Sequence, residues 1–402
     1  MRRLRWTFPR LKLPRRRRKK RVKARKEPRL LQTPRLREKR KQIKNNMLDI
    51  RDLISRIQKT DRPLLVGFLV ALVLAVLVAA VLPRFVFQTQ ERETVEEASA
   101  SQTTYRHPLT GVALAEPIEL PQVFSVMIDN HEEAWPPTGI DEAFLVIEAP
   151  VEAGISRMLA FFSEEQSVEQ IGPVRSARPY YLDWAEELDA MYVHVGGSNA
   201  ALDQIASGGI FDMNQYWWGE YFWRANGNRF APHNVFTSTE LLNAFYQLRE
   251  EVGVAPTRLY DLWTWKDPEP TGKDGVGLHV DFWAPVYVVD WVYDGETGRY
   301  LRSQFDEPHV TEAGEQIVAD NIAVVVTEIE IIDNVGRREI RTMGEGEGYV
   351  LQDGIVISAT WKKPSSSERL KFYNRATGEE IVMNAGVTWI EVVGSEEDIR
   401  IE

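Results

Sequence analysis

The longest uninterrupted apolar stretch in the sequence covers residues 64–82, reads LLVGFLVALVLAVLVAAVL and contains no charged side chain. At about 1.5 Å per residue, a helix of this length matches the hydrocarbon core of a bilayer, which is about 30 Å thick. The apolar region of a signal peptide is shorter, about 7–15 residues. We therefore expect a retained transmembrane helix. The sequence holds no second stretch of this length, which excludes a multi-helix channel or transporter.

Charge is distributed unevenly on the two sides of this stretch. Residues 1–63 hold 26 of the 49 Lys and Arg but only 5 of the 59 Asp and Glu, so they carry +21 and leave −31 for the remainder. The positive-inside rule places such a basic segment in the cytoplasm and the acidic remainder outside. The expected topology is a single-pass signal anchor in the cell membrane with an extracytoplasmic C-terminal domain.

The basic arm, residues 1–63, is of low complexity and is interrupted by prolines, a composition typical of disordered segments. Anionic lipid is its expected partner, because the anchor already holds the arm at the membrane, where each basic residue contributes about 1 kcal/mol. Nucleic acid is the less favoured partner. Apolar residues at helical spacing over 50–57 predict an amphipathic helix at the membrane surface.

Residues 83–106 are polar and acidic and are expected to form a linker. From 107 to 275, short apolar runs alternate with amphipathic stretches, which indicates an α/β domain. The runs predicted to be buried strands are 124–128, 143–147, 158–162 and 191–195.

Two helices are predicted in this domain. The shorter one covers 200–205. The longer one begins at a capping box formed by Thr237 and Glu240, continues with apolar residues at helical spacing, and stops at Gly253.

Residues 276–402 have almost no helical periodicity, and turns such as Asp294-Gly295 and Asp353-Gly354 separate their apolar runs. We expect a mainly antiparallel β-domain, or alternatively strands that complete a sheet begun in the first domain. The predicted fold class is thus α+β, preceded by a single transmembrane helix. The strand-like runs are 286–292, 322–332, 349–357, 370–373 and 388–393.

The complete absence of cysteine excludes disulfides, cysteine-ligated zinc, iron–sulfur clusters, a cysteine nucleophile and a lipid-bearing cysteine. The sequence also lacks a P-loop, a GxGxxG at a strand–helix junction, a GxSxG elbow and an HExxH, so the common nucleotide-binding, serine-hydrolase and metalloprotease classes have no support. No cofactor or metal is expected, and whether the protein is an enzyme remains open.

The segment IGPVRSARP, residues 171–179, is the richest in candidate chemistry. Arg175 and Arg178 flank Ser176, and both guanidinium groups can converge on one anion if the segment forms a tight turn or a helix start. The alternative is that each arginine pairs with a carboxylate of the protein.

A second candidate group follows the predicted strand 191–195. His194 precedes two glycines and Ser198, and glycines at a strand-to-helix turn can direct backbone N–H groups at a ligand. Arg229, His233 and Asn234 lie after the aromatic-rich residues 216–223, which either stack on a ligand or fill a core. His194 and His233 are the candidates for a general base.

Carboxylates supply the remaining candidates. Asp129 and Asn130 end the first predicted strand, a place where α/β proteins often bind ligands. Glu148 and Glu152 lie four residues apart around Pro150, and a pair of carboxylates can act as acid and base on a glycan.

Taken together, these strings resemble the YerB-like family of extracytoplasmic proteins, which has an N-terminal and a C-terminal part and no established reaction. The resemblance implies this two-part fold and an outer location, and it adds Arg157 to the candidate ligand-binding residues. Many relatives look like lipoproteins, whereas this chain has no cysteine and must use its transmembrane helix as the anchor. The matching segments are 108–111, 126–130, 148–157, 171–179, 194–198, Arg229, 232–234, 293–294, 297–300, 346–348, 354, 361–362 and 386–390.

Three functions follow as hypotheses. The first is an envelope protein that binds a polar or anionic cell-wall ligand in a cleft lined by arginine and histidine. The second is a hydrolase of wall glycan or peptide, in which a histidine works with Glu148 or Glu152. The third is a scaffold that recruits an envelope protein. The residues expected to line the cleft are Arg175, Arg178, His194, Ser198, Arg229 and His233.

Overall fold

The computed structural model describes residues 71–72, 105–225, 229–282 and 287–402. The chain divides into two units, Met1–Ala100 and Ser101–Glu402. Apart from Ala71 and Leu72, which are helical and exposed, the predicted arm, surface helix, transmembrane helix and linker up to residue 104 lie outside the described residues. No helix within the described ranges is long and apolar enough to cross a bilayer.

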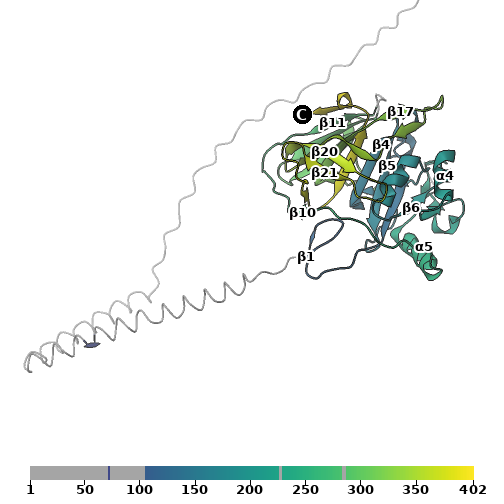
Figure 1. The fold of residues 1–402 in the computed structure, drawn as a ribbon, viewed down its shortest axis with the longest axis horizontal. Coiled ribbons are helices and arrows are strands. Elements are labelled where there is room, and N and C mark those ends of the chain that lie inside the picture. The colour runs from purple at the N-terminus through teal and green to yellow at the C-terminus, as the bar shows by residue number, and fades with distance from the viewer. Residues whose placement is uncertain (1–70, 73–104, 226–228, 283–286) are drawn as a thin grey trace, which may run out of the picture. The chain divides into compact units, whose positions relative to one another are not determined.

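A ten-stranded mixed sheet forms the centre of the second unit (Figure 1). Neighbouring strands are antiparallel except for the pairs β16–β23, β23–β4, β3–β6 and β6–β7, which are parallel. In spatial order the strands are β21 (Lys371–Asn374), β20 (Ile355–Lys363), β19 (Gly344–Gln352), β16 (Asn321–Val326), β23 (Thr388–Val393), β4 (Leu145–Pro150), β5 (Ser156–Ser163), β3 (Val123–Ile128), β6 (Met191–His194) and β7 (Asp212–Asn214).

This sheet is continuous across the two parts of the sequence. Its first five strands in the order above come from residues after 320 and its last five from residues before 215, and β23 joins them by parallel pairing with β4. The division into domains at 275/276 stays a prediction. The observed strand order fits the alternative expectation, in which strands of the second part complete a sheet begun in the first.

A second, six-stranded antiparallel sheet consists only of strands from after residue 277. Small two-stranded sheets complete the β-structure: β1 (Tyr105–Arg106) with β2 (Ala113–Leu114), β8 (Trp223–Arg224) with β9 (Val235–Phe236), β10 (Trp265–Lys266) with β22 (Met383–Asn384), and β17 (Ile329–Ile331) with β18 (Arg338–Ile340). The strands of the six-stranded sheet are β14 (Glu307–Pro308), β13 (Arg299–Gln304), β12 (Val288–Asp294), β11 (Leu278–Asp281), β24 (Ile399–Ile401) and, beside β13, β15 (Val318–Ala319).

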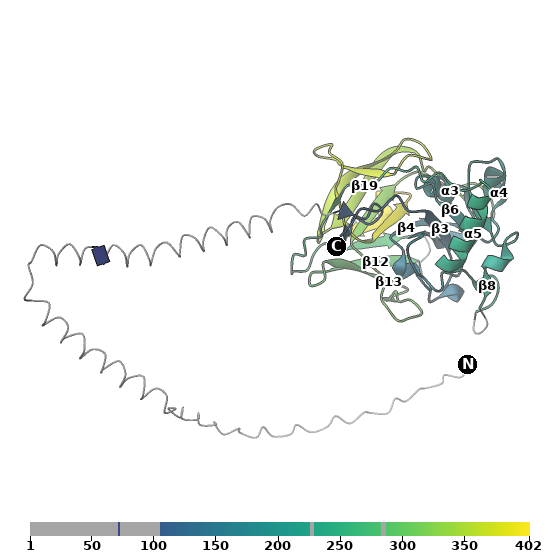
Figure 2. The same ribbon diagram turned by 90° about the horizontal axis from the view of Figure 1, so that it is seen from below.

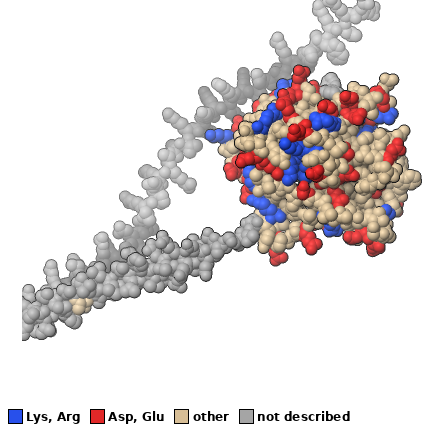
Figure 3. Space-filling view, viewed as in Figure 1, with Lys and Arg blue, Asp and Glu red and all other residues tan. Residues whose placement is uncertain are grey.

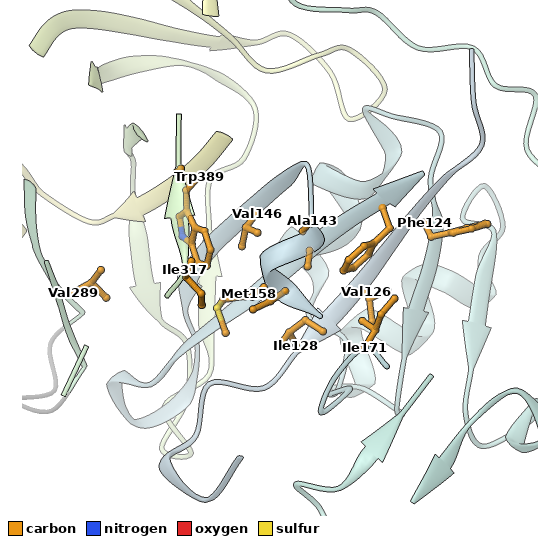
Figure 4. Close-up of a cluster of buried hydrophobic side chains, with 14 of the residues drawn as sticks. Phe124, Val126, Ile128, Ala143, Val146, Met158, Ile171, Val289, Ile317 and Trp389 are labelled. Atoms are coloured by element: carbon orange, nitrogen blue, oxygen red, sulfur yellow. The ribbon is translucent and has the colours of Figure 1, made fainter. Parts of the chain in front are cut away.

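Three helices, α3 (Pro179–Glu186), α4 (Asn199–Ala206) and α5 (Thr239–Glu251), gather near the end of the large sheet that holds β3 and β6 (Figure 2). Alternate residues of β3 enter two different buried clusters because side chains alternate between the faces of a strand. One cluster also contains residues of α5, and residues of the six-stranded sheet such as Val289 (Figure 4). The other cluster contains residues of α3. Each face of the large sheet is therefore covered, and each fully buried large apolar side chain contributes about 1.5–3 kcal/mol.

The expectation of a mixed fold with few helices and a β-rich second part is confirmed, but three local predictions are wrong. The long helix begins after Ser238, whose side chain accepts from the N–H of Leu241, because Thr237 is held in a bridge with Ile171. The run 349–357 is not one strand, because the turn predicted at Asp353-Gly354 divides it between β19 and β20. The run 322–332 breaks between β16 and β17. Apolar residues on both sides of this second break concealed it.

Candidate ligand-binding site

Three distant segments meet at the end of β3. The segment after Gly172 crosses this end: the N–H of Asp129 donates to the carbonyl of Pro173 (2.9 Å), and the N–H of Arg175 donates to that of Met127 (2.7 Å). The same segment pairs with the chain before α5, since the N–H of Val174 donates to the carbonyl of Val235 (2.7 Å). These backbone bonds place the side chains of Asp129, Arg175 and His233 together.

Asp129 is the centre of this group and is only 2% exposed. Its Oδ2 lies 2.7 Å from Nδ1 of His233 and 3.0 Å from Nε of Arg175. Burial alone raises the pKa of a carboxyl group, but the hydrogen bond from His233 and the charges of Arg175 and Arg157 outweigh it and lower the pKa of Asp129. Asp129 therefore remains ionised and holds both partners.

Arg157 and Arg175 have unused donors. Arg157 is 6% exposed, yet its guanidinium makes one hydrogen bond within the described ranges, from Nη1 to the carbonyl of Ser176 (2.9 Å). Burial and then the charges of Arg178 and Arg175 lower its pKa, whereas Asp129 raises it. The Arg175 side chain is 22% exposed, and its terminal nitrogens make no hydrogen bond to any described residue. Together with the neighbouring Arg178 and Glu152, three cations thus face two carboxylates.

Arg178 pairs with a different carboxylate. Its Nε and Nη2 donate to the two oxygens of Glu152, each at 2.7 Å, and its Nη1 donates to the carbonyl of Ala177 (2.7 Å). Convergence of Arg175 and Arg178 on one anion is therefore wrong: each arginine pairs with its own carboxylate, the alternative that the sequence left open. Ser176 contributes its backbone carbonyl to Arg157.

His194 and Ser198 are engaged in local structure. Nδ1 of the buried His194 lies 2.7 Å from the carbonyl oxygen of Gly196, and its Nε2 lies 3.1 Å from Asp212. The Ser198 side chain caps α4. The N–H of Gly196 donates to Asn214 (3.1 Å), and that of Ser198 donates to a backbone carbonyl. Two N–H groups of this glycine turn are therefore occupied within the protein, and an anion site at the turn stays a prediction.

Arg229 and Asn234 also have protein partners. Arg229 donates to the carbonyl of Pro136 and, at 3.3 Å, to Glu312. Asn234 accepts a hydrogen bond from Arg224 at 2.8 Å. They lie in the chain that carries His233 but are bound away from Asp129.

The aromatic-rich segment 216–223 divides between the two expected roles. Trp218 and Tyr221 pack edge-on against Phe245 of α5. Tyr216 and Trp217 are 69% and 77% exposed. The Tyr216 ring lies against Gly196, whose carbonyl accepts the N–H of Ala177, so an exposed aromatic side chain borders the segment of Arg175.

Glu148 is inside the protein and not in a cleft. Its carboxylate accepts hydrogen bonds from Ser156 (2.5 Å), Asn130 (3.2 Å), Arg302 (2.7 Å) and Trp389 (3.2 Å), and both Glu148 and Arg302 are fully buried. Asn130 therefore belongs to this buried network, although it follows Asp129 directly. Glu148 and Glu152 do not form the expected acid–base pair, because each is bound to a different arginine.

Sequence reasoning missed Glu391, which lies beside Glu148 in the register of β23 and β4. Its Oε1 accepts from Trp291 (2.7 Å), and its Oε2 has no partner among the described residues. Burial, and then the charge of Glu148, raise its pKa well above the usual value. It also missed Arg302, whose position between Tyr300 and Gln304 on the inner side of an alternating strand was an available signal.

A hollow of about 450 Å³ lies around the start of α5. None of its lining residues is a predicted site residue. Acidic and basic side chains are interspersed on the face shown in Figure 3.

Comparison with known proteins agrees with this architecture. Residues 109–252 match the family model "Protein of unknown function (DUF3048) N-terminal domain", and residues 278–390 match its C-terminal domain. The chain belongs to this family.

The chain is also similar to "Putative lipoprotein YerB" of Bacillus subtilis (strain 168), with 31% identity over 314 residues that cover 76% of this chain and 90% of the relative. The crystal structure of YerB from Bacillus subtilis matches with a TM-score of 0.65 and 30% identity, covering 74% of this chain and 99% of that chain. The similarity to the YerB-like family is confirmed.

Proposed function

We propose that this protein is anchored in the cell membrane by residues 64–82 and binds an anionic group of a cell-envelope ligand outside the cell. Arg157 and Arg175 are the proposed contacts, and Asp129 and His233 hold Arg175 in place. Tyr216, beside the same segment, adds an exposed aromatic face against which a sugar ring can pack.

The observation that carries this proposal is the incomplete hydrogen bonding of a buried arginine. Arg157 has five N–H donors, is 6% exposed and makes one hydrogen bond to the described residues. A buried charge is normally paired, because an uncompensated one is strongly destabilising. Asp129 and Glu152 supply two negative charges against Arg157, Arg175 and Arg178 together. A carboxylate or phosphate group from a ligand would complete this arrangement.

Neither of the other two hypotheses has comparable support. A hydrolase using Glu148 or Glu152 requires an available carboxylate, but Glu148 is fully buried and Glu152 is bound by Arg178 through two hydrogen bonds. A scaffold has no residue-level support in the described ranges.

The proposed location rests on the sequence and on a relative. The relative's name describes a lipoprotein, and this chain has an apolar stretch but no cysteine. Because the chain is cysteine-free, single cysteines report its topology without a background. We expect a membrane-impermeant maleimide on intact cells to label Ser367→Cys and to spare Thr33→Cys until the cells are lysed. Labelling of Thr33→Cys alone in intact cells would contradict the topology.

Binding can be tested with the full-length protein in detergent. Purified peptidoglycan, whose stem peptides carry free carboxylates, should retain the protein, and neutral chitin should not. Retention should weaken with salt, because partly exposed charges are screened. Arg175→Gln should reduce retention. Arg400→Gln is the control and should not reduce it, because Arg400 is exposed and makes a loose surface ion pair with Glu402 at 3.9 Å. Equal retention on both polymers, or no effect of Arg175→Gln, would refute the proposal.

A further inference from the structure

The end of β3 also carries a group of metal-ligating side chains. In the part of the chain that the structure describes, one group of at least three such residues has its ligand atoms within 4.8 Å of one another: His131, Glu133 and His233. His131 and Glu133 flank the start of the short 3-10 helix Glu132–Ala134, and His233 comes from the chain before β9.

His233 is oriented as metal-binding histidines are. Its Nδ1 lies 2.7 Å from Asp129, so Nδ1 carries the proton and donates to that carboxylate. In the neutral ring the lone pair is then on Nε2, which faces away from Asp129. A carboxylate that fixes the far nitrogen in this way is a regular feature of histidine–metal sites.

Glu133 lies close enough to His233 to bind the same metal ion. Its Oε2 is 3.4 Å from Nε2 of His233. This separation is longer than a good N–H···O hydrogen bond, about 2.7–3.2 Å. It equals the distance of about 3.4 Å between two ligands that each lie about 2.1 Å from a tetrahedral ion. The Glu133 side chain is 74% exposed, so an ion can reach it from solvent.

His131 completes the group with a small rearrangement. Its ring stacks on that of His233, with centroids 4.6 Å apart and an angle of 27°. Its Nδ1 accepts the N–H of Glu133 (3.1 Å), which leaves Nε2 for an ion if the ring proton moves to Nδ1. That change breaks only this side-chain cap, since the turn keeps the bond from the N–H of Ala134 to the carbonyl of His131 (2.8 Å).

We propose that His131, Glu133 and His233 bind a divalent first-row transition-metal ion, with Asp129 orienting His233. Two imidazole nitrogens and a carboxylate oxygen suit Zn²⁺ and its neighbours in the first row. Three protein ligands leave coordination positions for water or for an external group. The sequence predicted no metal because it contains no known metal-ligand motif. In the proposed site, two ligands are two residues apart and the third, His233, is far from them in the sequence. This site shares Asp129 and His233 with the proposed envelope-ligand site, but its test uses no envelope ligand.

Cobalt binding tests the site directly. The full-length protein, purified in detergent without a histidine tag and stripped of metal, is titrated with Co²⁺ while its visible absorption is recorded. We expect bands that saturate at about one equivalent and disappear when Zn²⁺ is added. His131→Gln and Glu133→Gln should each weaken Co²⁺ binding at least about tenfold, and Asp129→Asn about 10- to 100-fold.

His279→Gln is the matched control. His279 also pairs through Nδ1 with a carboxylate, Asp290 at 2.7 Å, but it is not part of the three-residue group. Its substitution should leave the Co²⁺ titration unchanged. If wild-type protein gives no bands, or if Glu133→Gln and His131→Gln bind Co²⁺ as tightly as wild type, the site does not exist. Because Glu133 is exposed, its variant decides the question even if substitutions of buried His233 prevent folding.

Discussion

The neighbouring residues Asp129 and Asn130 contact two different charged clusters. The two clusters differ in how many of their hydrogen-bond donors have a partner in the protein. Asn130 contacts the Glu148–Arg302 cluster, in which the carboxylate accepts four hydrogen bonds and the fully buried arginine packs against Trp291 and Trp389. Asp129 contacts the Arg157–Arg175 cluster, in which most guanidinium donors have no partner among the described residues. The first cluster is closed to solvent, and the second reaches it.

This difference separates a structural role from a binding role. A buried ion pair contributes little beyond a hydrophobic replacement, but removal of one partner is strongly destabilising. An ion pair whose spare donors reach solvent can accept another anion, whereas the spare Nε of Arg302 is buried. We therefore expect substitutions in the first cluster to change stability and substitutions in the second to change binding.

The largest effect is expected for Arg302→Met. It leaves Glu148 buried without its cation, so the free energy of unfolding should fall by about 3–5 kcal/mol. Guanidinium unfolding of the full-length protein in detergent, followed by tryptophan fluorescence, measures this. The double variant Arg302→Met/Glu148→Gln should lose less than the sum of the single variants. A loss below about 0.5 kcal/mol for Arg302→Met would contradict a closed cluster.

The next effect concerns the two adjacent glutamates. Because the pKa of Glu391 is raised in the folded state, the fold binds its proton more tightly than the unfolded chain does. The stability that this proton provides is present below the unfolded pKa, about 4.3, and is lost as pH rises through the folded value.

Glu391→Gln imitates the protonated form and should stabilise the protein at pH 7 by on the order of 1 kcal/mol, with the gain disappearing near pH 4. Unfolding curves between pH 4 and pH 8 measure the difference. Glu148→Gln, which weakens the contact with Arg302, should be destabilising at pH 7. Destabilisation of similar size in both variants at pH 7 would show that Glu391 is ionised and paired.

The smallest effect is expected for Arg175→Gln, which is compared with Arg178→Gln in the same segment. Arg178→Gln removes two charge-assisted hydrogen bonds to Glu152 and should lower the free energy of unfolding by about 1–3 kcal/mol. Arg175→Gln should change it by less than about 1 kcal/mol, because Arg175 makes only one ion contact and is partly exposed. The same unfolding assay checks both, and the reverse order would contradict the assignment of roles.

Much of the fold follows from the sequence. The strand 388–393 has its predicted bounds, and the helix 199–206 extends the predicted one by one residue at each end. These segments are predictable because burial imposes short apolar runs, and because glycine and serine mark the helix start. The joining of β23 to β4 could not be predicted, since the pairing of distant parallel strands leaves no local pattern.

The sequence predicted which residues form the site but not which of them pair with one another. Asp129, Arg157, Arg175 and His233 were all candidates, yet the sequence contains nothing that assigns Arg178 to Glu152 and Arg175 to Asp129. Such pairings depend on how the segment after Gly172 crosses β3. The arm and the transmembrane helix remain predictions, because they lie outside the described residues apart from Ala71 and Leu72.

The most direct test of this account is the affinity of the full-length protein for a soluble peptidoglycan fragment with free carboxylates, N-acetylmuramoyl dipeptide, measured by titration calorimetry. Arg157→Gln and Arg175→Gln should each raise Kd at least about tenfold, the loss expected for a charge-assisted hydrogen bond. Arg178→Gln, whose donors are already occupied, should leave Kd within about threefold of wild type. Equal losses in all three variants, or a loss in Arg178→Gln alone, would contradict an open site at Arg157 and Arg175.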